Sequence, residues 1–104
     1  MHATVRRYEG VDQSRTEELT KKINESLVPR LSKLPGFDGY VLIEAGNGVV
    51  TSVGFYDTSE QADESTRVAA SWLTDEKLDT VVPNAPKITG GKVTVNKTNG
   101  VAAL

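Results

Sequence analysis

One cation and three aromatic rings are the side chains of this 104-residue sequence best suited to bind a small molecule. They are Arg7, Tyr40, Phe55 and Trp72. Arginine can anchor a carboxylate or another oxyanion through paired N–H donors, and aromatic rings can enclose a flat apolar ligand. We therefore predict a cleft lined by these four residues, and we assign no catalytic residue. The competing interpretation of Trp72 is an ordinary core residue.

The choice of arginine depends on which face of a strand turns inward. Residues 2–8 alternate as a strand, so Arg6 and Arg7 point to opposite faces. Ala3 and Val5 are the apolar pair of that strand, and Arg7 shares their face, which predicts that Arg7 faces the helices. A shift of one residue in the neighbouring hairpin would place a different set in the cleft. That set is Arg6, Tyr8 and Tyr56. Alternatively, the inward arginine pairs with Glu44 or Asp57, or reaches past the end of the sheet.

The sequence lacks the residues that a catalytic triad, a zinc site or a phosphate loop would need. His2 is the only histidine and there is no cysteine, so neither a Ser-His-Asp triad nor a zinc site is expected. Gly46-Asn47-Gly48 lacks the spacing and the lysine of a phosphate loop. We predict no cofactor and no metal. A net charge of −2 argues against nucleic acid as a partner. Short apolar runs and the lack of a signal-peptide pattern predict a cytoplasmic protein without membrane contact.

The elements that position the candidate residues follow from periodicity. Ser14 with Glu17 marks the start of a helix whose leucine stripe continues to Leu34, with a bend at Pro29. Asn47-Gly48 predicts a hairpin between strands 37–45 and 49–57. A second helix runs from residue 58 to about residue 80, with a core stripe and Trp72 on its flank. The stripe residues are Ala62, Thr66, Ala69 and Leu73. Strand 87–97 follows, with a bulge at Gly90-Gly91.

This βαββαβ order predicts one ferredoxin-like α+β domain over residues 1–97, followed by a flexible tail, 98–104. Its four-stranded antiparallel sheet carries both helices on one face. Pairing the hairpin around Asn47-Gly48 places Tyr40, Leu42, Val53 and Phe55 on one face. The opposite face then carries Val41, Ile43, Ala45, Val50 and Tyr56. Because both faces are apolar, we predict a homodimer through the sheet face that carries Val41, Ile43 and Val50.

The segment Leu34-Pro35-Gly36-Phe37-x-Gly39-Tyr40, followed by a hairpin, resembles the dimeric α/β-barrel superfamily, which includes the antibiotic-biosynthesis monooxygenases. The resemblance covers most of residues 2–97. It implies that two sheets close into a barrel, with a cleft between helices and sheet in each subunit. The haem-degrading branch uses a helix histidine and a strand asparagine, and this chain has neither.

Two functions remain open. The first is a cofactor-independent monooxygenase or isomerase acting on a small aromatic or polyketide-type molecule, as the resemblance implies. The second is a non-catalytic dimer of the ligand-binding or stress-response type. An open cleft in which Arg7, Tyr40 and Trp72 converge favours the enzyme, whereas a packed interface between helices and sheet favours the second function.

Overall fold

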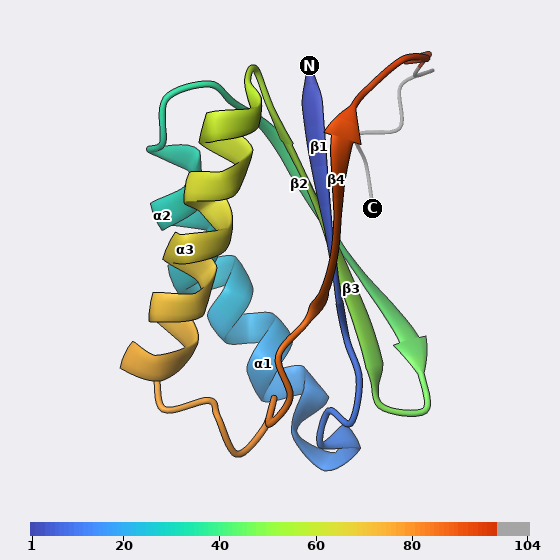
Figure 1. Cartoon of the computed structure of the whole chain (residues 1–104). Helices are drawn as coiled ribbons and strands as arrows, with labels where there is room; N and C mark the ends of the chain where they lie inside the picture. Colours follow the sequence, from blue (N-terminus) through green and yellow to red (C-terminus); the bar gives the residue numbers. More distant parts are fainter. Residues whose placement is uncertain (98–104) are drawn as a thin grey trace.

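The computed structural model describes residues 1–97 (Figure 1). Four antiparallel strands form one sheet in the order β2-β3-β1-β4. They are β1 (His2–Tyr8), β2 (Phe37–Gly46), β3 (Val49–Tyr56) and β4 (Lys87–Lys92). The helices all lie on one face of this sheet (Figure 1). The predicted α+β ferredoxin-like fold is therefore confirmed.

The first helical segment changes its winding as it approaches the proline. It passes through a 3₁₀ turn, an α-helix, a π-helical turn and a second α-helix. These are η1 (Gln13–Arg15), α1 (Thr16–Lys22), η2 (Ile23–Leu27) and α2 (Val28–Ser32). Pro29 has no N–H and its ring crowds the preceding turn, so a wider turn before it relieves the crowding. Four residues of the predicted leucine stripe are buried across this change, Leu19, Ile23, Leu27 and Leu31, whereas Leu34 is half-buried.

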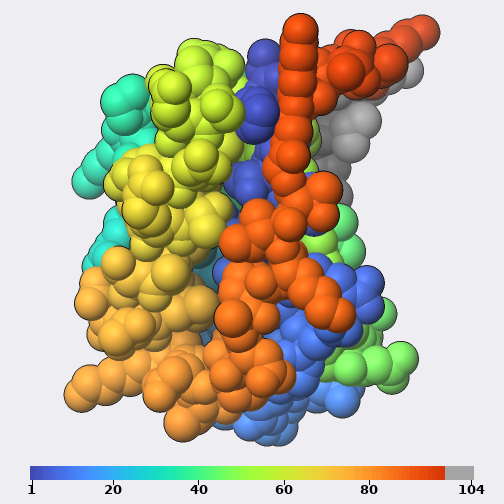
Figure 2. All heavy atoms as spheres, viewed as in Figure 1, coloured from blue at the N-terminus to red at the C-terminus, as the bar shows by residue number. Residues whose placement is uncertain are grey.

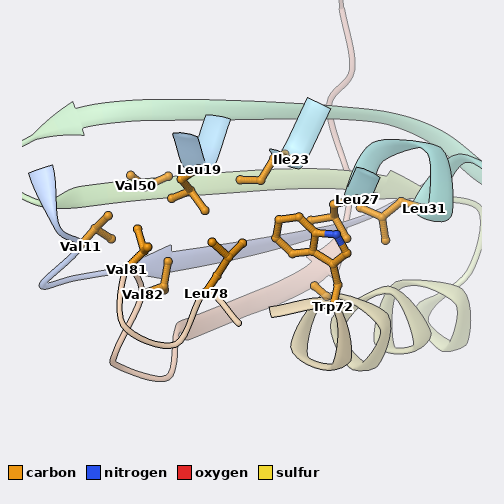
Figure 3. Close-up of a cluster of buried hydrophobic side chains, with 11 residues drawn as sticks. Val11, Leu19, Ile23, Leu27, Leu31, Val50, Trp72, Leu78, Val81 and Val82 are labelled. Atoms are coloured by element: carbon orange, nitrogen blue, oxygen red, sulfur yellow. The ribbon is translucent and has the colours of Figure 1, made fainter. Parts of the chain in front are cut away.

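The helix between β3 and β4, α3 (Ser59–Asp75), begins at a capping box between Thr58 and Gln61. It ends earlier than predicted, and Lys77 follows in the left-handed region at φ 56°. Its buried residues are Ala62, Ser65, Ala69 and Trp72, so the stripe is rotated from the predicted one. Trp72, only 1% exposed, projects from α3 into the core beside Ile23 and Leu27 (Figure 3). The chain after α3 adds Leu78, Val81 and Val82 to the same core.

The β2–β3 hairpin contains the feature that periodicity missed. Asn47 and Gly48 both have positive φ, as predicted for the turn. Gly46 pairs with Val49, but Glu44 pairs with Val50, so Ala45 is an extra residue in a β-bulge. Beyond this bulge the register is shifted by one residue relative to the prediction. Tyr40 consequently lies opposite Gly54 rather than Phe55.

The shift exchanges the two faces of β3. Val50 and Tyr56 turn toward the helices and are 4% and 0% exposed. Val53 and Phe55 turn to the outer face, where they join Val41 and Ile43. The predicted pairing of faces was wrong for β3, and Val50 does not belong to the outer face.

The remaining strand is more regular than predicted. β4 ends at Lys92 rather than at residue 97, and Gly90 and Gly91 pair with Thr4 and Ala3 without a bulge. The predicted tail, 98–104, lies outside the described residues. Across residues 1–97, every helix is too short or too polar to cross a membrane.

The ring of Tyr56 lies over Gly54, so a side chain at position 54 would collide with it. A Cβ atom there would be 2.9 Å from Cε2 of Tyr56. Gly54→Ala should lower the free energy of unfolding by about 1–3 kcal/mol, measured by urea denaturation. Gly91→Ala is the control, because nothing lies within 4 Å of its added Cβ. Equal effects of the two substitutions would contradict the packing of Tyr56 over Gly54.

Candidate functional site

A buried arginine occupies the middle of the sheet. Arg6 is 1% exposed and faces α3. Its Nη1 donates to Ser65 Oγ and Thr66 Oγ1, at 3.4 Å each. No carboxylate within residues 1–97 forms an ion pair with Arg6, and its Nε has no hydrogen-bond partner. Taking a guanidinium out of water costs several kcal/mol unless an acceptor compensates, so this charge is only weakly compensated by the chain itself.

Two tyrosine phenols, those of Tyr8 and Tyr40, lie near the Arg6 guanidinium. Burial raises the pKa of Tyr8, and the positive charge of Arg6 opposes that rise. Burial likewise raises the pKa of Tyr40, against the charge of Arg6 and the nearby Ser52 hydroxyl. Both phenols therefore stay protonated at neutral pH and can donate hydrogen bonds.

Further hydroxyl groups in the same region have no partner. Ser52 lies opposite Arg6 on the neighbouring strand. Its hydroxyl and that of Tyr56 are buried without a hydrogen-bond partner among the described residues. We call Arg6, Tyr8, Tyr40 and Ser52 the Arg6 centre, and Tyr56 lies farther along β3, opposite His2. A buried cation with free hydroxyl groups around it has the chemistry of a receptor for an anionic oxygen.

Two grooves enter the space between helices and sheet from opposite sides. The α3–β4 groove has a volume of about 340 Å³, and its walls include Tyr8, Thr66, Leu73 and Ile88. In the space-filling view it lies between yellow α3 and the orange segment that leads into β4 (Figure 2). Since Thr66 accepts a hydrogen bond from Arg6, the cation lies directly behind the wall of this groove.

The second groove lies between α1 and the edge strand β2. Its volume is about 350 Å³, and Lys21, Asn24, Tyr40 and Leu42 are among its lining residues. Tyr40 thus separates this groove from Arg6, as Tyr8 does on the other side. Between the grooves the interface is packed and retains a cavity of only about 20 Å³.

The four predicted lining residues do not meet in one place. Tyr40 faces the helices as predicted. Arg7 and Phe55 lie on the outer face of the sheet, because β1 turns Thr4 and Arg6 inward and the Ala45 bulge turns Phe55 outward. Their predicted place in the cleft was therefore wrong. Arg7 instead lies 3.7 Å from the carboxylate of Glu9.

Trp72 has the features of a core residue. Its Nε1 donates to Ser26 Oγ at 2.9 Å, and Ser26 donates to Glu76 Oε1 at 3.1 Å. The indole N–H is therefore satisfied within the chain and is not free to bind a ligand. Only the ring of Trp72 contributes a surface, to the small cavity.

The set that does face the helices is Arg6, Tyr8 and Tyr56, the alternative that follows from a shift of one residue in the hairpin. Ser52 and Thr66 complete it. Ser52 was missed because a single hydroxyl residue carries no periodic signal, and Thr66 was predicted only as part of the core stripe of the second helix. Among residues 1–97 no three His, Cys, Asp or Glu side chains gather closely enough to hold a metal ion.

No profile of a known protein family matches the chain, and no curated protein matches it in sequence. Solved structures do share its fold. A protein of unknown function from Nitrosomonas europaea is 14% identical, with a TM-score of 0.73 over 95% of this chain and 94% of that one. A monooxygenase encoded by ActVA-Orf6 of Streptomyces coelicolor, in complex with nanaomycin D, is 13% identical, with a TM-score of 0.70 over 95% and 92%.

A dimeric ferredoxin-like protein from an uncultured marine organism is 17% identical, with a TM-score of 0.63 over 94% of this chain and 97% of that one. At these identities the similarity shows the fold alone. The chain has the ferredoxin-like fold, which it shares with these structures and with two described as putative antibiotic biosynthesis monooxygenases.

Because burial raises their pKa values, Tyr8 and Tyr40 should ionise above the ordinary tyrosine pKa of about 10. The folded state then prefers the protonated phenols. The stability that the protonated phenols contribute is fully present at pH values below the ordinary tyrosine pKa. It is lost as the pH rises through the raised pKa values of Tyr8 and Tyr40. Tyrosinate absorbance, compared between wild type and the Tyr8→Phe and Tyr40→Phe variants, isolates each titration. A difference curve centred at the ordinary pKa would contradict the burial of that phenol beside Arg6.

Proposed function

We propose that this protein binds a small aromatic or polyketide-type molecule in the α3–β4 groove and oxidises it as a cofactor-independent monooxygenase. The observation that carries the proposal is Arg6, a buried cation behind the wall of that groove that has no carboxylate partner among residues 1–97. A bound molecule with an acidic phenol or enol would supply the missing negative charge. Its oxygen would accept hydrogen bonds from Tyr8 and Thr66.

The proposed chemistry follows from stabilising that anion. A positive charge near the bound oxygen favours its ionised form in a site of low polarity. The resulting enolate is electron-rich at carbon and reacts with molecular oxygen without a flavin or a metal. An activated CH₂ group becomes C=O: one oxygen atom enters the product, the other leaves as water, and the substrate supplies all four electrons. A fold neighbour is a monooxygenase, which supports the proposal by analogy of fold only.

A second candidate function is a non-catalytic dimer of the ligand-binding or stress-response type. The interface between helices and sheet is packed, which is the outcome expected for this second function, and the central cavity measures only about 20 Å³. A ligand would then occupy the groove without chemistry. The two candidates differ in one measurable quantity, the consumption of oxygen in the presence of a bound aromatic molecule.

Replacing Arg6 with a neutral side chain of similar length tests its role in turnover separately from its effect on the free energy of unfolding. Anthrone and naphthol serve as probes, with binding followed by Trp72 fluorescence and turnover by an oxygen electrode. Arg6→Met should lower turnover about 100-fold, the effect of losing one transition-state donor. Its free energy of unfolding should stay constant or rise, because a buried charge that the chain compensates only weakly is removed.

Arg7→Met is the matched control, since it removes the same charge one residue away on the outer face. It should keep both binding and turnover. Equal activity of the two variants would refute the role of Arg6. Binding that depends on Arg6 without oxygen consumption would select the non-catalytic candidate.

We also propose that the outer face of the sheet pairs with a second copy of the chain. Val41 and Ile43 are 41% and 49% exposed there, beside the half-exposed Val5, Val53 and Phe55. An apolar patch of this kind on one side of a sheet is typical of a protein interface. The dimeric neighbour of the same fold is consistent with this arrangement.

Ile43→Asp should dissociate this dimer at micromolar concentration, because it places an unpaired charge in a dry interface. Val95→Asp makes the same kind of exchange at a position that is 85% exposed and lies outside the sheet, so it should leave the dimer intact. Sedimentation equilibrium measures both. A wild-type protein that sediments as a monomer would rule out the proposed interface.

A further inference from the structure

We infer that the small cavity beneath the α3–β4 groove is a binding site for molecular oxygen. This inference rests on the proposed monooxygenase function, for which oxygen is the second substrate. It assigns a role to a space in the core that binding of the aromatic molecule does not use. The cavity lies where the first helical segment, α3 and the sheet meet, and its volume is about 20 Å³.

The walls of this cavity are almost entirely carbon. They include Ala69. They also include Leu19, Leu27, Val50 and the ring of Trp72, which are labelled in Figure 3. The one indole N–H is turned away to Ser26. A buried water needs two to four polar partners, and this cavity does not provide them. An apolar diatomic molecule needs none.

The volume of the cavity also limits the size of the molecule that it can hold. About 10–15 Å³ is the least space that holds one water-sized molecule, so about 20 Å³ admits a diatomic gas and excludes an aromatic ring. The cavity is therefore too small for the organic ligand, which is assigned to the groove of about 340 Å³.

The cavity proposed to hold oxygen adjoins the groove proposed to hold the aromatic molecule. Tyr8, Leu73 and Val82 line both the cavity and the α3–β4 groove. Oxygen held in the cavity would lie against the inner end of the groove, next to the phenol proposed to hold the ligand anion. It would reach the enolate directly across the side chains that line both spaces.

Dissolved oxygen is paramagnetic and serves as its own probe in the unliganded protein. Methyl NMR spectra recorded under oxygen and under argon should show relaxation enhancements several-fold larger for Leu19, Leu27 and Val50 than for other buried methyl groups. Leu31, Leu78 and Val81 are the internal controls, because each is 0% exposed and none lines the cavity. Equal enhancements in the two sets would overturn the inference.

Filling the cavity tests its role in turnover. Ala69→Val adds two carbons to the wall, whereas Ser71→Val places the same side chain on the exposed side of α3. Ala69→Val should abolish the excess relaxation and raise the KM for oxygen several-fold, and Ser71→Val should change neither. Loss of the relaxation effect with an unchanged KM would overturn the assignment of this cavity to catalysis.

The two proposals fail in different ways. If oxygen enters the cavity but no probe molecule is oxidised, the monooxygenase function fails and the cavity remains a gas site established by NMR. If turnover occurs while the cavity methyl groups show no excess relaxation, the function stands and the oxygen site is wrong.

Discussion

The burial of the Arg6 guanidinium constrains the rest of this structure. A cation that is 1% exposed must be solvated by the protein, and the surrounding side chains are arranged for that purpose. Ser65 and Thr66 of α3 accept its hydrogen bonds, and the phenols of Tyr8 and Tyr40 lie close enough for its charge to affect their pKa values. The helix stripe is rotated accordingly, with Ser65 at its centre instead of a fully apolar residue. None of these groups carries a negative charge, so hydroxyl groups alone solvate the cation among the side chains named here.

Glycine and the β-bulge make room for this polar centre. The ring of Tyr56 can lie along β3 because position 54 has no side chain. The extra residue at Ala45 changes the pairing of β2 with β3, so that Tyr40 shares the inner face with Ser52 instead of Phe55. The same shift places Val53 and Phe55 beside Val41 and Ile43 on the outer face. One local irregularity therefore determines both the composition of the candidate site and that of the face proposed to pair with a second copy.

The apolar core and the polar centre divide the interface between helices and sheet. Trp72 fills the core, and its N–H is satisfied through Ser26 and Glu76. Ser26 belongs to the π-helical turn, so the irregular winding before Pro29 supplies the partner of the indole. This packing closes the middle of the interface and leaves the grooves at its sides. Tyr8 lines one of these grooves and Tyr40 lines the other, so a ligand in either groove would contact one of the two phenols near Arg6.

The sequence by itself determined the order of the elements, the Asn47-Gly48 turn, the break near Pro29 and the leucine stripe, because each depends on residues close together in the chain. It also established that one of Arg6 and Arg7 must face packed material. Only the tertiary structure decided which. The usual rule places the apolar face of a strand inward, but both faces of this sheet are apolar, so alternation could not tell inside from outside. The bulge at Ala45 has no signature of its own, and a one-residue shift reverses every side chain beyond it.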